Sequence, residues 1–250
     1  MYFDELQQLA EKGDAEAMFN MGVCFYTGRG VKKVYPEAVK WFDAAAKQRN
    51  IKAQYNLGLC YLLGRGVAAN YETAAKWFFL AAKQRNTKAQ YNLGCCYEKG
   101  IGVAVDMVMA AKWFYAAAKE GEAAAQYKIG YFYFNNIAVK ENKQVGIDWI
   151  KKSADQGFKD AVIFLKDLTD SGIDYDTAFD PKAKVAPVES APAETAPVAE
   201  TAPVVDATPT ETAPVAETAP VVDATPTETA PAVEEVKAEV AAEDVDDIDI

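Results

Sequence analysis

The stretch AQYNLGLCYLLGRGVAANYETAAKWFFLAA, residues 53–82, decides the fold of this chain of 250 residues. Its pattern recurs with a period of 36 residues, and the register never slips. An aliphatic residue followed by glycine marks one helix of each unit, and a tryptophan marks the other. The equivalent positions are Met21-Gly22, Leu57-Gly58, Leu93-Gly94 and Ile129-Gly130, and Trp41, Trp77, Trp113 and Trp149. A fixed period of this length predicts a stack of structural repeats.

The sequence pattern of each unit predicts two amphipathic helices. Ala53, Leu57, Gly58 and Tyr61 share one helical face, and a second apolar face recurs over residues 74–82. Asparagine or aspartate stands at most helix starts, where its side chain caps the free backbone amides. Glycine follows the first helix, where a left-handed residue ends it. The fold class is therefore predicted to be all-α, with helix-turn-helix repeats over 14–157 and half-repeats on either side that complete a solenoid over 1–171.

The remaining residues, 172–250, predict a disordered acidic tail rich in Pro, Ala, Thr and Val. The sequence ETAPVAETAPVVDATPT occurs twice without change, at 194–210 and 211–227. Residues 181–250 hold 3 Lys against 16 Asp and Glu, whereas residues 1–180 hold 23 basic and 21 acidic side chains. Such a composition has little apolar surface to bury, and its prolines interrupt helices.

The end of the tail differs from the rest, because aliphatic residues alternate with aspartates there. Val245, Ile248 and Ile250 resemble a short linear motif that adds as a strand or enters a groove. The alternative is a terminus that only adds charge and solubility.

Composition excludes several kinds of chemistry. The chain has no histidine, so it has neither a Ser-His or Cys-His nucleophile nor a His-ligated metal. Cys24, Cys60 and Cys96 share one repeat position, with Cys95 beside the last, and a row along a solenoid cannot converge on one metal. They are predicted to pack as buried thiols, and no catalytic, cofactor-binding or metal-binding residue is predicted.

Location and partners can also be predicted from composition. The amino-terminal residues lack the features of a signal peptide, and apolar runs are too short to cross a bilayer, so we expect a cytoplasmic protein without a membrane partner. The basic loops 47–50 and 83–86 favour nucleic acid only weakly, because the first 180 residues carry almost no net charge. The oligomeric state stays open.

Units such as Ala53–Tyr61, Gly64–Val67 and Ala74–Ala82 resemble the Sel1-like repeat, a relative of the tetratricopeptide repeat. The resemblance covers about residues 2–170. It implies a right-handed superhelix of antiparallel helix pairs and a non-catalytic adaptor that binds a protein or peptide. In the related fold the first helix of each unit lines the concave face. The residues placed there are Lys52, Tyr55, Asn56, Lys88, Tyr91, Asn92, Lys99 and Tyr127.

Other interpretations remain beside this one. The tyrosines and asparagines of the concave face also suit helix packing. A disulfide-rich branch of the family is associated with beta-lactam hydrolysis, but its paired cysteines correspond here to Ala46 and Gln54 and their equivalents, and no Ser-x-x-Lys motif occurs. We therefore predict no enzyme activity. A third hypothesis places the acidic end of the tail in the lysine-bearing groove as an autoinhibitor.

Overall fold

The computed structural model describes residues 3–140, 142–173, 175 and 234. Over this part of the chain it contains helices and no strand. Each helix packs mainly on its neighbours in sequence, so the predicted α-solenoid of 36-residue helix pairs is confirmed. The helices are α1 (Phe3–Glu11), α2 (Ala15–Thr27), α3 (Tyr35–Lys47), α4 (Ile51–Leu63), α5 (Tyr71–Lys83), α6 (Thr87–Lys99), α7 (Met107–Lys119), α8 (Ala123–Asn135), α9 (Lys143–Asp155) and α10 (Lys159–Asp170).

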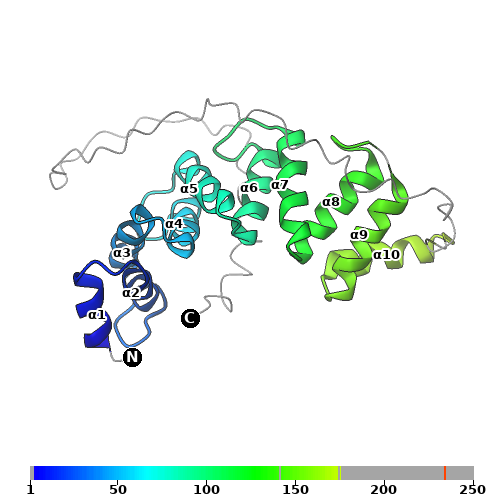
Figure 1. Cartoon of the computed structure of the whole chain (residues 1–250). Coiled ribbons are helices and arrows are strands. Elements are labelled where there is room, and N and C mark those ends of the chain that lie inside the picture. The colour runs from blue at the N-terminus through cyan, green and yellow to red at the C-terminus, as the bar shows by residue number, and fades with distance from the viewer. Residues whose placement is uncertain (1–2, 141, 174, 176–233, 235–250) are drawn as a thin grey trace.

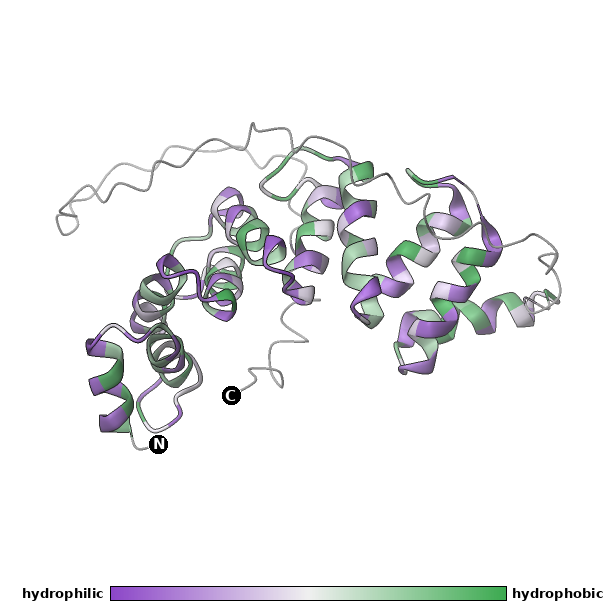
Figure 2. Ribbon diagram, viewed as in Figure 1, coloured by the Kyte–Doolittle hydropathy of each residue, from purple (hydrophilic) through white to green (hydrophobic). Residues whose placement is uncertain are grey.

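The helix pairs follow one another along an arch (Figure 1). In this view α2 and α4, the first helices of their units, lie on the inner side of the arch, and α3 and α5 lie on the outer side. The helix α1 is hydrophobic toward α2 and hydrophilic on its other side, as Figure 2 shows. No helix among the described residues is long and apolar enough to cross a bilayer.

Side-chain caps and left-handed glycines set the helix ends. The carboxylate of Asp14 and the amide oxygens of Asn50 and Asn86 accept hydrogen bonds from the backbone N–H groups three residues later, at 2.7, 2.9 and 2.7 Å. Gly64 ends α4 with a φ of 68°. In the fourth unit Asn136 takes this place with a φ of 57°, because asparagine tolerates the left-handed region better than most residues.

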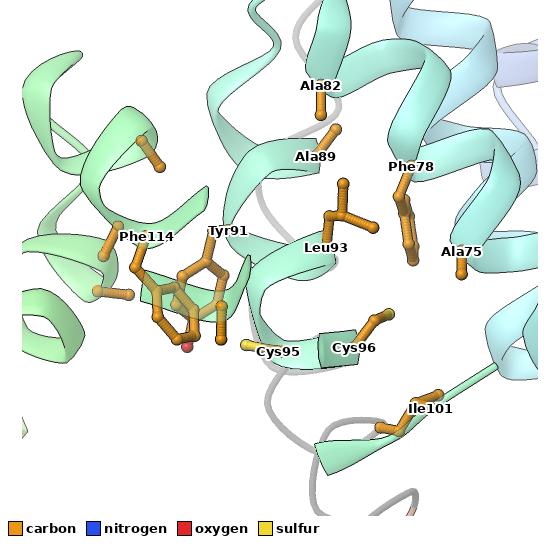
Figure 3. Close-up of a cluster of buried hydrophobic side chains, with 14 of the residues drawn as sticks. Ala75, Phe78, Ala82, Ala89, Tyr91, Leu93, Cys95, Cys96, Ile101 and Phe114 are labelled. Atoms are coloured by element: carbon orange, nitrogen blue, oxygen red, sulfur yellow. The ribbon is translucent and has the colours of Figure 1, made fainter. Parts of the chain in front are cut away.

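In each of the first three units, one phenylalanine packs on the helix glycine of the same unit. Phe78 is fully buried, and a Cβ on Gly58 would lie 2.7 Å from its ring. The neighbouring aromatic residues join successive units, since Trp113 stands edge-on to Phe79 with 6.2 Å between ring centroids. Figure 3 shows this core around α6, where Leu93 faces Phe78 of the preceding unit.

In the fourth unit, smaller residues form the contact between the two helices. Ile150 occupies the position of the core phenylalanine, and Gly146 occupies that of a core alanine. A Cβ on Gly130 would lie 2.7 Å from the carbonyl oxygen of Gly146. The backbones of α8 and α9 therefore meet directly, because no ring separates them.

In two of the Gly-x-Gly loops, the second glycine has a role that the sequence interpretation did not include. A Cβ on Gly66 would lie 2.5 Å from the backbone of Tyr35, and one on Gly102 would lie 2.0 Å from the carbonyl oxygen of Tyr71. These glycines thus make room for the start of the outer helix of the preceding unit.

Candidate binding face

The predicted binding residues lie on the first helices of successive units, at positions related by the repeat. We call this set the inner face. It consists of Lys52, Tyr55 and Asn56 on α4, Lys88, Tyr91, Asn92 and Lys99 on α6, and Tyr127 on α8.

The three tyrosines of the inner face pack against aromatic rings of the core. Ring centroids lie 6.0 Å apart for Tyr55 and Phe78, and 5.7 Å apart for Tyr91 and Phe114. Tyr91 is 7% exposed, whereas Tyr55 and Tyr127 are half-buried. Burial raises the pKa of Tyr127, and the nearby Asp160 raises that pKa further. These rings contribute to packing, and their contact with a partner stays a prediction.

The polar residues of the inner face differ in their access to solvent. The side-chain N–H of Asn56 donates to the carbonyl oxygen of Lys52 at 2.9 Å, and Asn92 is 2% exposed. The ammonium of Lys52 is 3.9 Å from a carboxylate oxygen of Glu16 and 5.7 Å from the ring centroid of Phe19. Of these three side chains, Lys52 is the one most available to a ligand.

The sequence interpretation missed Lys128 on α8, which lies next to Tyr127 of the inner face in the sequence. Its ammonium lies 3.0 Å from Oε2 of Glu98, and the side chains are 20% and 18% exposed. This partly buried ion pair joins α6 to α8. The repeat period was the signal that could have revealed it, because position 128 is equivalent to Asn56 and Asn92.

Buried glutamines stand at the positions where the disulfide-rich branch would have cysteines. The side-chain N–H of Gln54 donates to the carbonyl oxygen of Ala46 at 3.3 Å. Gln90 makes the same bond to Ala82 at 3.3 Å, and Gln126 makes it to Ala118 at 3.2 Å. A hydrogen bond thus joins the two positions that a disulfide would join in that branch.

A second glutamine completes this network in two of three units. Gln84 donates to Oε1 of Gln54 at 2.7 Å, and Gln156 donates to Oε1 of Gln126 at 2.8 Å. In the unit between them the equivalent residue is Glu120, a carboxylate that pairs with Arg85. Oε1 of Gln90 is therefore buried without a hydrogen-bond partner in the part of the chain that the structure describes.

None of the four cysteines, all of which are described, forms a disulfide, and Cys60, Cys95 and Cys96 are buried. Burial raises the pKa of Cys96 to about 12, so this residue is a protonated thiol at neutral pH. Among the described residues no three His, Cys, Asp or Glu side chains are grouped so as to hold a metal ion. The tail residues Val245, Ile248 and Ile250 lie outside the described residues.

Comparison with known proteins agrees with this architecture. The Sel1 repeat matches residues 15–50, 51–86, 87–122 and 123–158. A Sel1 repeat protein from Oxalobacter formigenes is 33% identical with a TM-score of 0.64, over 70% of this chain and 74% of its own. A protective antigen with an SLR fold, present in uropathogenic Escherichia coli strains, is 35% identical with a TM-score of 0.66, over 68% of this chain. The match spans 36% of that antigen.

No curated protein matches this sequence. The family assignment therefore rests on the repeats themselves and on the solved structures. Because four contiguous Sel1 repeats cover more than half of the sequence and their helix pairs are stacked as the period predicts, this chain belongs to the Sel1 repeat family.

Proposed function

We propose that this chain is a non-catalytic cytoplasmic adaptor that binds a protein or peptide on its inner face. Sel1-repeat solenoids are commonly scaffolds for protein–protein interaction. The observation that carries the proposal is the recurrence of one set of side chains, a lysine, a tyrosine and an asparagine, at equivalent positions of α4 and α6. Lys52, Tyr55, Asn56 and Lys88 of this set reach solvent, whereas Tyr91 and Asn92 are buried. A row of like side chains suits an extended ligand, which presents its own groups at regular intervals.

The chemistry of the inner face suggests the kind of ligand. Lysines attract carboxylates, and amide side chains can both donate to and accept from a peptide backbone. Tyrosines add flat, partly apolar surface that contacts a ligand at little entropic cost. We expect a segment with acidic side chains. The free cysteines also fit a reducing compartment, where thiols stay reduced.

Site-specific photocrosslinking in native lysate tests this proposal. The photoreactive residue benzoylphenylalanine replaces Tyr55 or Asn56 on the inner face, or Leu80 on the outer helix α5, in the full chain. Leu80 is a matched control, because it is an exposed apolar residue on the opposite helix of the same unit. We expect one discrete protein to be captured from both inner positions and not from position 80. Capture of the same protein from Leu80, or none from the inner positions, would contradict the proposal.

A further inference from the structure

Positive charge is concentrated in the middle of the solenoid. Residues 44–97 contain eight Lys and Arg side chains and a single acidic one, Glu72. Because residues 1–180 together are almost neutral, the parts of the solenoid on either side of this stretch carry a net negative charge. The basic stretch therefore stands out as a local feature.

Six of these eight basic side chains come from one sequence pattern that occurs twice. The segments 47–52, KQRNIK, and 83–88, KQRNTK, form the turns α3–α4 and α5–α6 and the starts of the helices that follow. The two turns lie at the same end of neighbouring units, and Gln84 of the second turn donates a hydrogen bond at 2.7 Å to Gln54, which lies in the first turn of α4 just after the first segment. We call this set the basic edge: Lys47, Arg49, Lys52, Lys83, Arg85 and Lys88.

Solvent reaches the charged groups of the basic edge. The side chains of Lys47, Lys52 and Arg85 are 68%, 49% and 78% exposed. The carboxylates that pair with them in the described part of the chain are those of Asp43, Glu16 and Glu120. These three side chains therefore remain about half exposed or more despite their ion pairs.

Backbone strain marks the same two turns. Arg49 and Arg85 adopt left-handed conformations with φ of 65° and 67°. The equivalent position in the other turns between units is glycine, at Gly13, Gly121 and Gly157, which adopts this conformation without strain. A non-glycine residue there costs about 1–2 kcal/mol, and strain of this kind gathers at functional sites. Both turns thus carry a guanidinium where glycine would be more stable.

We propose that the basic edge is the docking site for the acidic segment 234–250 of the same chain. This segment contains eight Asp and Glu and one Lys, so its charge opposes that of the edge almost one for one. The number of intervening residues, 176–233, is sufficient, because even a random coil of that length would span about 40 Å on average, and a proline-rich chain would span more. Helices pack about 8–10 Å apart, so the few units between α10 and the edge lie within that reach.

Lys52 and Lys88 belong to both the basic edge and the inner face. The docked segment therefore competes with a ligand of the inner face, a consequence that rests on the proposed function. The docking itself does not depend on it, and the experiment below measures docking alone.

Zero-length carbodiimide crosslinking of the full chain, read by mass spectrometry, tests the docking. The reagent joins a lysine ammonium to a carboxylate that contacts it. We expect crosslinks from Lys47, Lys52, Lys83 and Lys88 to carboxylates of 234–250, in the monomer and at a yield independent of protein concentration. High salt should abolish them, because it screens surface charges. The crosslink yield at Lys159 and Lys166 on α10 gives the background, because both lysines are exposed and lie outside the basic edge.

The double substitution R49G/R85G separates docking from folding. It removes two charges and places glycine in the left-handed conformation, so the thermal midpoint should stay equal or rise. We expect crosslink yield at the edge to fall about threefold to tenfold. The control K159Q/K166Q should leave the yield unchanged.

Three results would overturn the proposal. Crosslinks found equally on Lys159 and Lys166 would mean unspecific attraction. Crosslinks found only in covalent dimers would mean that the segment of a second copy occupies the edge. Absence of crosslinks, together with retention of an oligonucleotide that R49G/R85G fails to retain, would assign the edge to nucleic acid instead.

Discussion

At the scale of single residues, Glu120 is the mismatch in the buried amide network. Gln84 and Gln156 each donate a hydrogen bond to the buried glutamine of the same unit, whereas the carboxylate of Glu120 has no N–H to donate. Oε1 of Gln90 therefore stays buried without a partner among the residues that the structure describes. An unsatisfied buried acceptor costs about 1–3 kcal/mol, which is more than an exposed ion pair usually contributes.

The substitution E120Q should therefore stabilise the protein. The new amide can donate to Oε1 of Gln90, and the exposed contact with Arg85 is lost. We expect the free energy of unfolding to rise by about 1 kcal/mol, measured by urea denaturation with an unchanged m-value.

The reverse substitution in the neighbouring unit, Q84E, is the matched control. It removes the donor to Gln54, so it should lower the free energy of unfolding by about 1–3 kcal/mol. A loss of stability in E120Q would show that the contact with Arg85 contributes more than the buried hydrogen bond.

At the scale of helices and turns, the glycines of the Gly-x-Gly loops are not equivalent. Gly30, Gly66 and Gly102 all have positive φ, so alanine is strained at each of them. Around Gly30 nothing lies within 4 Å of an added Cβ, whereas at Gly102 that atom would overlap the carbonyl oxygen of Tyr71. The contact between units therefore adds a second penalty at Gly102.

Alanine substitutions at Gly30 and Gly102 should distinguish the cost of the left-handed conformation from the cost of crowding between units. G30A should lower the free energy of unfolding by about 1 kcal/mol, the cost of the left-handed conformation alone. G102A should lower it by roughly 2–4 kcal/mol, because the start of α5 must also move away. Urea denaturation measures both, and equal losses would contradict the role assigned to Gly102.

Most of the element order could be predicted from the sequence, because the period fixes it. The 36-residue spacing of the Leu-Gly pairs and the tryptophans placed every helix pair, and the caps followed from Asn50 and Asn86. Contacts between units were harder to predict. The crowding at Gly66 and the left-handed arginines depend on where a neighbouring backbone lies, and neither hydropathy nor spacing reports that distance.

The candidate site was predictable only as a set of positions. The period located Lys52, Tyr55 and Asn56 on an inner helix, but it did not show that Asn92 is buried while Lys52 is exposed. The period would also have located Lys128, which stands where the two preceding units have asparagine. Residue type at one position therefore changes along the stack while the backbone position is kept.

At the scale of the whole molecule, the core is divided along the chain. The largest cluster of buried side chains runs from Leu59 to Trp149 and a second from Phe19 to Cys60, whereas the ends have small clusters of their own. The first end cluster joins α1 to α2 through Leu6, Ala10, Ala17 and Met21. In a stack where each unit touches its neighbours, such ends open at a smaller free energy than the centre.

Two leucine-to-alanine substitutions should show this division. L6A removes a buried side chain from the cluster that joins α1 to α2, so amide hydrogens of α1 should exchange faster while those of α6 keep their protection. L93A opens a cavity in the central cluster, costs about 2–5 kcal/mol, and should raise exchange throughout the stack. Hydrogen exchange read by mass spectrometry compares the two. If L6A reduced protection in α6 as much as L93A does, the solenoid would unfold as a single unit, and the ends would have no stability of their own.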